Sequence, residues 1–376
     1  MDGTLVEDES VDGGDVGPPG LRVDPVGADG PSADVPLVPG GVIRHKHGYM
    51  RRYFFPMEPV PVILTDTNLV KPALSWNLEY LEKNLGDGDF SVFYSKDHKF
   101  KYYDQAKYND KVVPDFTPPM SQATMKFSEF LVKFRQWKHG QPRMYLQHPL
   151  NDSVGKAIKD DFLAFNWKWL ESVQKEHNWG NLSSNLIYIG MEGNVTPVHY
   201  DEQENFFAQV EGFKRCILFP PETFECLYPY PVFHPHDRQS QVDFDKPDFE
   251  SFPKARHLRG FECVLEPGDV LYIPKYWWHH VESLLGAGHT TSINFWYKSG
   301  PLTQVEYPLK PQRKVAMIRN LEKVVTEALG NPFEVGPLFE ALALGRYIKV
   351  NALSHSELGS LNRYPSKPNP QVSTIE

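Results

Sequence analysis

Short apolar runs dominate the chain between residues 184 and 297. Each run is rich in β-branched and aromatic side chains and is bounded by Pro, Gly, Asn or Asp, a pattern typical of strands. We predict eight strands, at residues 184–190, 198–200, 205–210, 215–219, 262–265, 270–273, 279–283 and 290–297. Eight short antiparallel strands at this spacing indicate a jelly roll, so the expected fold is mostly β, a double-stranded β-helix with flanking helices.

The segment before residue 184 has a mixed pattern. Residues 61–64 and 91–94 predict buried strands, and residues 76–85 predict an amphipathic helix that ends at Gly86. A second helix is expected to begin near Ser121 and to stop at Gly140. Its apolar positions recur at intervals of three and four, as in a helix with one buried face: Phe127, Phe130, Leu131, Phe134 and Trp137.

Helical periodicity returns after Pro311. A first helix should end at Gly330, and a second short segment covers residues 335–344. The first helix has an apolar face formed by Val315, Ile318, Leu321, Val325 and Leu329. Helices attached to a closed barrel must bury such a face, either on their own barrel or against a second copy of the chain, and both alternatives remain open.

Charge and composition divide the chain further. The formal net charge of the 376 residues is −9, yet residues 1–41 alone hold nine acidic residues and one basic residue, a net charge of −8. We therefore expect a disordered acidic tail at 1–41, because so few apolar residues cannot offset the entropy cost of ordering. The expected units that follow are an α/β flanking region at 42–183, a jelly-roll core at 184–310, helices at 311–347 and a flexible tail at 348–376.

Two features of the sequence bear on partners and compartment. The near-neutral remainder of the chain gives no basic surface for nucleic acid, and no apolar stretch approaches the roughly 20 residues that cross a bilayer. The three cysteines, Cys216, Cys226 and Cys263, are expected to be buried reduced thiols, because they are odd in number and lie in apolar strand-like runs. The sequence has no paired Cys-x-x-Cys spacing of the kind that a cysteine-ligated zinc site needs. We expect a protein of the cytoplasm and nucleus, without a membrane or nucleic-acid partner.

One predicted strand carries a His-x-Asp pair. His199 and Asp201 are separated by one residue, so on a strand both side chains project from the same face. The segment at 277–280, Trp-Trp-His-His, could add an imidazole from a distant strand, after a tight Pro-Gly-Asp turn at 267–269. Two imidazoles and one carboxylate make the facial triad that binds iron(II). Strand alternation lets only one of His279 and His280 face the site, and the pattern does not decide between them.

An iron site of this type needs a co-substrate that supplies two electrons. 2-Oxoglutarate is a candidate, because it chelates iron and carries a second carboxylate that needs a cation inside the barrel. No Lys or Arg occurs between His280 and Tyr297, so the cation must come from another strand. Lys214 is the best remaining candidate, although it could also be an exposed lysine in a hairpin turn.

Several motifs identify a family resemblance. Four of them resemble JmjC-type, cupin-like 2-oxoglutarate oxygenases: GNVTPVHYDEQENFF at 193–207, CILFPP at 216–221, PGDVLYIP at 267–274 and WWHH at 277–280. Others resemble the protein asparaginyl hydroxylases of that family: DFSV at 89–92, DRQSQVDFD at 237–245, NFWYK at 294–298 and EVGPL at 334–338. The resemblance extends from about residue 60 to Tyr347 and does not include either tail.

The resemblance implies roles for individual residues. The implied iron(II) ligands are His199, Asp201 and His279. The residues implied to bind 2-oxoglutarate are Tyr145, Thr196, Asn205, Lys214 and Asn294, with Lys214 on the distal carboxylate. The residues implied to hold the substrate are Tyr102, Arg238, Gln239 and Trp296, with Gln239 facing a side-chain amide. Trp296 could equally be a plain core aromatic. The insertion at 229–259, which interrupts the strands, contains two of these four.

The resemblance also implies an activity and partners. We expect a dioxygenase that uses iron(II), 2-oxoglutarate and O₂ to hydroxylate the β-carbon of asparagine in an extended peptide. Implied substrates are the C-terminal activation segment of hypoxia-inducible factor α and ankyrin-repeat proteins, and a homodimer through residues 311–347 is implied as well. Two alternatives remain: a JmjC histone lysine demethylase, and a metal-binding cupin that acts only as an interaction module.

Overall fold

The computed structural model describes residues 42, 44–45, 59–150, 154–301 and 305–344. The two predicted tails, residues 1–41 and 348–376, lie outside the described residues, so the predictions made for them remain predictions. Within the described ranges, none of the helices has the length and apolar composition needed to cross a membrane.

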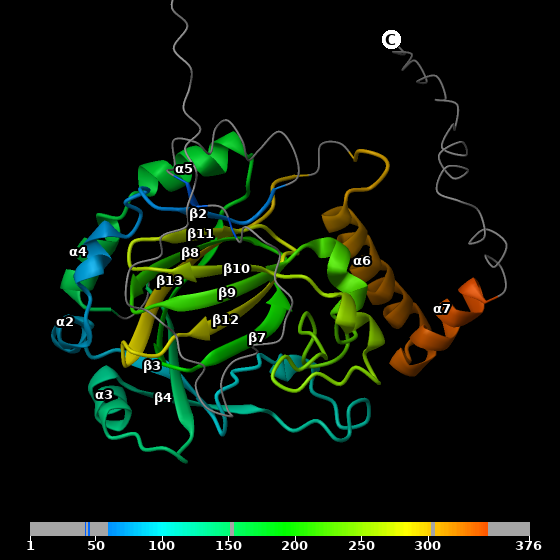
Figure 1. Cartoon of the computed structure of the whole chain (residues 1–376), viewed down its shortest axis with the longest axis horizontal. Helices are drawn as coiled ribbons and strands as arrows, with labels where there is room; N and C mark the ends of the chain where they lie inside the picture. Colours follow the sequence, from blue (N-terminus) through cyan, green and yellow to red (C-terminus); the bar gives the residue numbers. More distant parts are fainter. Residues whose placement is uncertain (1–41, 43, 46–58, 151–153, 302–304, 345–376) are drawn as a thin grey trace, which may run out of the picture.

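Two facing sheets form the centre of the molecule (Figure 1). The small sheet has the strand order β10-β9-β12-β7, and the large sheet contains the order β11-β8-β13-β6. These eight strands are β6 (Leu182–Met191), β7 (Val195–Tyr200), β8 (Glu204–Glu211), β9 (Lys214–Phe219), β10 (Phe261–Leu265), β11 (Val270–Ile273), β12 (Trp278–Ser283) and β13 (His289–Tyr297). Each one overlaps a predicted run, and the predicted mostly-β jelly roll is confirmed.

Strands from the N-terminal flanking region widen the large sheet to nine strands. At one edge β2 pairs with β11 and β1 pairs with β2; at the other edge β5 pairs with β6, followed by β3 and β4. Their bounds are β1 (Arg44–His45), β2 (Val62–Leu64), β3 (Asp89–Ser95), β4 (Met120–Lys126) and β5 (Arg143–Pro149). The large sheet therefore begins well before the first strand of the jelly roll.

The helix expected from Ser121 to Gly140 is wrong in its first part. Residues Met120–Lys126 form β4, which pairs with β3 along its whole length, and helix α3 (Phe127–Arg135) begins only afterwards. Pairing with β3 decides the conformation here, because a strand at a sheet edge gains its hydrogen bonds from residues distant in sequence. The aromatic positions at 127, 130 and 134 are on the helix, as the periodicity predicts.

Helices cover the outer face of the large sheet (Figure 1). Phe206 of β8 packs outward in this layer, whereas Phe207 points between the two sheets. The helices of this layer are α3, α2 (Leu78–Asn84), α4 (Lys156–Leu163) and α5 (Trp167–Glu176). Elsewhere in the chain, short 3₁₀ helices occupy Lys71–Ser75, Gln105–Lys107, Pro221–Cys226, Pro253–His257 and Pro332–Glu334. Cys216 and Cys263 are buried as predicted, but Cys226, in a 3₁₀ helix, is only partly buried.

The insertion at 229–259 covers the outer face of the small sheet. Phe244 packs against Phe219 with ring centroids 5.6 Å apart, and Ala255 and Leu258 join the same cluster. The insertion therefore closes the side of the small sheet that faces away from the large sheet, and the barrel interior lies between the two sheets.

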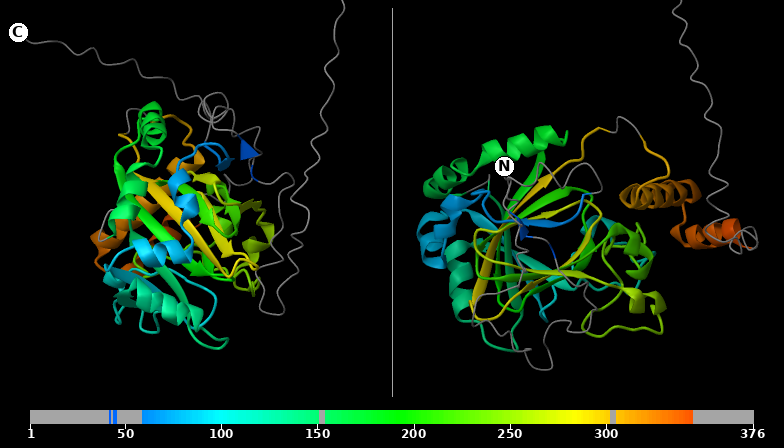
Figure 2. Two further views of the ribbon diagram at one scale, coloured as in Figure 1. Left: turned by 90° about the vertical axis from the view of Figure 1, so that its left-hand side faces the viewer. Right: turned by 45° about the horizontal axis from the view of Figure 1, so that its top comes forward.

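The C-terminal helices lie together at one end of the barrel (Figures 1 and 2). Helix α6 (Pro311–Leu329) ends at Gly330 and is followed by α7 (Val335–Ala343). Val315 is buried beside the insertion, but Ile318 is 41% exposed and Leu321 is 49% exposed. Two of the five positions of the predicted apolar face are therefore exposed to solvent.

The turn between β8 and β9 makes a specific prediction. Gly212 has φ +69°, and a Cβ there would lie 2.4 Å from the carbonyl oxygen of His289. We expect Gly212→Ala to lower the unfolding free energy by about 1–3 kcal/mol through backbone strain alone, with the collision adding to this loss. The control is Gly286→Ala, where φ is also positive but a Cβ would meet nothing within 4 Å. Equal urea midpoints for the two variants would contradict the close approach at Gly212.

Candidate active site

The side chains of His199, Asp201 and His279 meet at the mouth of the barrel. One ligand atom from each lies within 4.8 Å of the others. His199 on β7 and His279 on β12 are direct cross-strand partners, with ring centroids 4.2 Å apart, and Asp201 follows β7 by one residue. The antiparallel pairing thus joins residues that are far apart in sequence. Among the described residues, this is the one cluster of three His, Cys, Asp or Glu side chains that could hold a metal ion.

Both imidazoles are oriented by backbone carbonyl groups. Nδ1 of His199 lies 2.9 Å from the Pro197 carbonyl oxygen, and Nδ1 of His279 lies 3.1 Å from that of Trp277. Each Nε2 therefore keeps its lone pair for a ligand. Burial, helped by the neighbouring His279, lowers the pKa of His199 to about 3, and burial also lowers the pKa of His279. Neutral imidazoles are the form that binds a metal ion.

The Asp201 carboxylate is held by two other side chains. Arg238 Nη1 lies 3.2 Å from its Oδ1, and Trp296 Nε1 donates to its Oδ2 at 3.0 Å. Burial alone would raise the pKa of Asp201, but the nearby His199, His279 and Arg238 side chains outweigh burial and lower it. The donor set of two neutral imidazoles and one ionised carboxylate fits a divalent metal such as iron(II).

His280 points to the opposite side of its strand. Its Nε2 lies 3.1 Å from Glu282 Oε1, and its ring packs near Phe244 of the insertion. His280 is therefore on the outer face of the small sheet, where the insertion buries it. Of the two adjacent histidines, His279 is the one that reaches the triad.

Lys214 lies inside the barrel and is not an exposed hairpin residue. Its side chain is 1% exposed, and its Nζ donates to the Tyr145 hydroxyl at 2.9 Å. The ammonium also lies within 5.3 Å of the ring centroids of Tyr145 and Phe207. None of the ion pairs among the described residues includes Lys214. A buried ammonium without an anion is costly, so this position fits a carboxylate ligand.

The other residues implied to bind the co-substrate surround Lys214 and the triad. Tyr145 can lie over β6 because Gly190 faces it: a Cβ there would be 2.9 Å from the tyrosine ring. Thr196 lines the same cavity as Tyr145. Asn205 on β8 and Asn294 on β13 are buried, with Asn294 Nδ2 donating to Asn205 Oδ1 at 3.2 Å.

A cavity of about 820 Å³ opens from the triad toward the surface. Its lining includes all four residues implied to hold a substrate: Tyr102, Arg238, Gln239 and Trp296. Tyr102 lies at the exposed rim, whereas Gln239 is 2% exposed and its Oε1 has no hydrogen-bond partner. Trp296 is more than a core aromatic, because it donates to Asp201 from the cavity wall. The unpartnered Gln239 oxygen is placed to accept a hydrogen bond from an amide.

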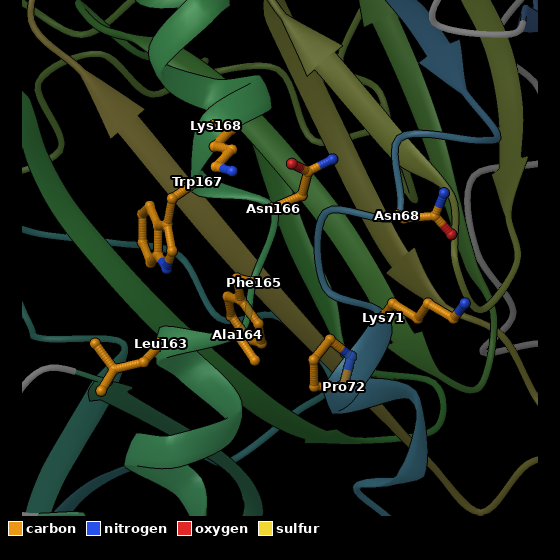
Figure 3. Close-up of a pocket in the computed structure, with 9 residues that line it drawn as sticks. All are labelled: Asn68, Lys71, Pro72, Leu163, Ala164, Phe165, Asn166, Trp167 and Lys168. Atoms are coloured by element: carbon orange, nitrogen blue, oxygen red, sulfur yellow. The ribbon is translucent and has the colours of Figure 1, made fainter.

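A second hollow of about 800 Å³ lies between the 3₁₀ helix at Lys71–Ser75 and the link from α4 to α5 (Figure 3). Its walls are formed mainly by Pro72, Leu163, Phe165 and Trp167. The residues that line it include two lysines but no imidazole and no carboxylate. Although the two hollows have similar volumes, only the cavity at the triad combines metal-binding and acid–base groups.

Sequence reasoning missed one of the residues that line the cavity. Arg319 of α6 is 4% exposed and lines the cavity, where it contacts Asp237 and Glu202. The one feature of the sequence that could have indicated a buried arginine is its position four residues after Val315, on the same face of the predicted helix. The periodicity of the helix predicts apolar packing on that face, and the sequence does not indicate which residue a charged side chain there would bind.

Comparisons with known proteins agree with this geometry. Residues 52–302 match the family model described as a cupin-like domain. The chain is 32% identical over 256 residues to lysine-specific demethylase JMJ30 of Arabidopsis thaliana, covering 67% of this chain and 52% of that protein. It is 28% identical over 246 residues to lysine-specific demethylase 8 of Xenopus tropicalis (65% and 49%), and 28% identical over 291 residues to human HSPB1-associated protein 1 (73% and 56%). The chain spans about half the length of these relatives.

Metal binding by the triad can be tested without any turnover. Asp201→Ala leaves two imidazoles and should abolish measurable binding of cobalt(II), a spectroscopic probe for such sites. Trp296→Phe removes the donor to Asp201 and should weaken cobalt affinity by about 10–100-fold, the usual effect of losing an outer hydrogen bond. The measurement is an absorption titration of each protein with cobalt(II).

The matched control for this titration is Trp137→Phe. Trp137 Nε1 donates to the backbone carbonyls of Gln141 and Pro142, far from the triad in the fold. Its variant should bind cobalt(II) like the unchanged protein. If Trp296→Phe and Trp137→Phe had equal affinities, Trp296 would not position the carboxylate.

Proposed function

Because this chain belongs to the family of cupin-like domains, we propose that it is an iron(II)- and 2-oxoglutarate-dependent oxygenase that hydroxylates asparagine side chains in proteins. JmjC members of the family are 2-oxoglutarate-dependent oxygenases. The observation that carries the proposal is the combination of the His199, Asp201 and His279 triad with a buried lysine that lacks an anion. A metal-binding module without catalysis would have no use for that lysine.

The residues of the barrel have separate tasks in this reaction. His199, Asp201 and His279 would hold iron(II), and Lys214 with Tyr145 and Thr196 would bind the distal carboxylate of 2-oxoglutarate. When bound, iron(II) and 2-oxoglutarate supply the oxidising chemistry: O₂ is consumed, succinate and CO₂ leave, and one oxygen atom enters the substrate. Asn205 and Asn294 lie on the neighbouring strands of the large sheet, where their amides can orient the oxo-acid end of the co-substrate.

The cavity supports an amide-bearing substrate. Gln239 Oε1 is buried and unpartnered, and it can accept a hydrogen bond from the side-chain NH₂ group of asparagine. Arg238 and Tyr102 line the route to the surface, where an extended peptide can lie. By its resemblance to the factor inhibiting hypoxia-inducible factor, the chain would act on the C-terminal activation segment of hypoxia-inducible factor α and on ankyrin repeats.

The names of two relatives raise a second candidate function. Lysine-specific demethylases JMJ30 and 8 share the cupin-like domain with this chain. Demethylation would use the same metal centre but would require a pocket that accepts a methylated ammonium group. The unpartnered acceptor at Gln239 favours an amide, so we rank demethylation second and include it in the same experiment.

The activity test uses two peptides. The purified full-length protein, with iron(II), 2-oxoglutarate and ascorbate, should add one oxygen atom to the β-carbon of asparagine in a peptide from the hypoxia-inducible factor α activation segment. Gln239→Leu should lower kcat/KM for this peptide by about 5–150-fold, because the substrate amide would be left without a buried hydrogen-bond partner, at a cost of about 1–3 kcal/mol. Mass spectrometry of the products reports both results.

The same reaction with a trimethylated histone H3 peptide is the comparison. Loss of a methyl group from that peptide, with the asparagine peptide unchanged, would replace hydroxylation by demethylation. No change in either peptide, together with no succinate, would favour the non-catalytic module.

We further propose that α6 and α7 form a homodimer. Apolar side chains exposed on α6 include Met317, Leu321 and Val324, whose spacing of four and three places them along one face of the helix, and Leu338 of α7 is exposed as well. Single exposed apolar residues are ordinary, but a row of them along one helix face is typical of an interface. A second copy is the proposed partner, because the resemblance that implies the activity also implies dimerisation through this region.

Dimerisation predicts a change in sedimentation. Leu321→Asp places a charge in the centre of the exposed row and should convert a dimer into a monomer at micromolar concentration. Val132→Asp, on the exposed face of α3, is the control and should remain dimeric. Analytical ultracentrifugation that shows the unchanged protein as a monomer would contradict the proposal.

A further inference from the structure

Three separate parts of the chain meet at one carboxylate beside the cavity. Arg319 of α6 binds Asp237 in bidentate fashion, with Nη1 2.6 Å from Oδ1 and Nη2 3.0 Å from Oδ2. Lys107 Nζ, from the 3₁₀ helix at Gln105–Lys107, lies 2.6 Å from the same Oδ2. Asp237 itself belongs to the insertion. The carboxylate therefore links the insertion to the C-terminal helix on one side and to the cavity rim on the other.

Arg319 also reaches the strand that carries the triad. Its Nε lies 3.1 Å from Glu202 Oε1, and its Nη1 donates to the Tyr200 hydroxyl at 3.1 Å. Tyr200 and Glu202 flank Asp201 in the sequence. One guanidinium thus holds both the end of β7 and the insertion that crosses it. Within this cluster the cations Lys107 and Arg319 face the carboxylates of Asp237 and Glu202, and Glu322 of α6 lies nearby, where it accepts a hydrogen bond from the Val232 N–H at 2.7 Å.

Asp237 directly precedes the two insertion residues that face the triad. Arg238 contacts Asp201 and has φ +71°, a left-handed conformation that is unfavourable for a residue with a side chain. Gln239 follows, paired with His199 through an isolated β-bridge; the residue lines the cavity, and its amide oxygen is buried without a hydrogen-bond partner. A strained backbone persists only where the surroundings hold it firmly. Backbone hydrogen bonds tie this segment to β7, with the Tyr200 N–H donating to the Arg238 carbonyl at 3.1 Å, and the side-chain contacts of Asp237 add a second anchor from α6 and the cavity rim.

Packing of α6 on the insertion does not require the buried charges of Arg319 and Asp237. Val315, one turn earlier on α6, attaches the helix to the insertion through apolar contacts. Buried ion pairs contribute little net stability compared with apolar residues of similar size, but they fix geometry through their directed hydrogen bonds. An arginine at this position therefore serves geometry more than stability.

We propose that Arg319 is a positioning residue for the peptide substrate: by holding Asp237, it fixes Arg238 and Gln239 over the triad. The inference rests on the proposed peptide hydroxylation and adds the residue that sets peptide affinity from outside the barrel. Arg319 does not contact the residues around Lys214 in the described structure. Its effect should therefore fall on the peptide and not on 2-oxoglutarate.

The test compares kinetic constants of the full-length protein and four variants. These are Arg319→Gln, Arg319→Lys, Asp237→Asn and the control Lys314→Gln, an exposed residue of the same helix. Arg319→Gln should raise the KM for the asparagine peptide by about 10–100-fold, as the loss of an outer hydrogen-bonding shell does. The KM for 2-oxoglutarate should match that of the Lys314→Gln protein, and the peptide-independent formation of succinate should fall by a smaller factor than the peptide KM rises.

Two further results separate positioning from a general loss of structure. Asp237→Asn should also raise the peptide KM, and the double variant with Arg319→Gln should lose less affinity than the two single losses combined, because both changes break the pair between Arg319 and Asp237, whereas the contacts of Arg319 with Glu202 and of Asp237 with Lys107 are separate. Arg319→Lys keeps the charge but not the bidentate fork and should restore part of the affinity. Anisotropy of a fluorescent form of the peptide, with zinc-loaded protein, should rank the variants in the same order without turnover.

Several outcomes would overturn the inference. One is an Arg319→Gln protein with the peptide KM of the control; another is an equal loss in peptide KM, 2-oxoglutarate KM and uncoupled succinate formation. If Arg319→Gln does not fold, unchanged peptide affinity in both Arg319→Lys and Asp237→Asn would have the same meaning. If the unchanged protein hydroxylated no asparagine peptide, the proposed function itself would be wrong. That result differs from the outcomes above, which all require an active unchanged protein or a measured peptide affinity.

Discussion

The arrangement of the site depends on a buried cation for which the described chain supplies no anion. Lys214 begins β9 inside the barrel, where it has the Tyr145 hydroxyl and two aromatic faces as neighbours. An ammonium in such surroundings costs several kcal/mol, and only an opposite charge can offset that cost well. The barrel therefore carries a built-in preference for a carboxylate ligand. Gly190, which lets the Tyr145 ring approach, is a necessary part of this arrangement.

The triad is placed relative to this cation by the small sheet. β12 pairs with β7 on one side and with β9 on the other, so the strands of His199, His279 and Lys214 are neighbours. The carbonyls of Pro197 and Trp277 turn both imidazoles toward Asp201, and burial keeps them neutral. A dicarboxylate that chelates a metal at the triad with one end and binds Lys214 with the other would provide both a metal ligand and the anion that Lys214 lacks.

Local sequence patterns predicted the barrel well because its strands are short, rich in β-branched and aromatic residues, and end in clear turn residues. The His-x-Asp pair could be recognised for the same reason, since both side chains lie on one face of β7. The choice of His279 over His280 came from resemblance, and the parity of β12 agrees with it. β4 was missed because its pairing with β3, and not its own periodicity, decides its conformation. Arg319 was missed because its role depends on where α6 docks, which no local pattern contains.

In the proposed function, Lys214 binds the distal carboxylate of 2-oxoglutarate. The most direct measurement is a calorimetric titration of zinc-loaded protein and its Lys214→Met variant with 2-oxoglutarate, and with 2-oxobutyrate, which lacks the distal carboxylate. We predict that Lys214→Met weakens 2-oxoglutarate binding by about 10–100-fold, the value of one charged hydrogen bond, and leaves 2-oxobutyrate binding unchanged. Equal affinity of the two proteins for 2-oxoglutarate would contradict this account.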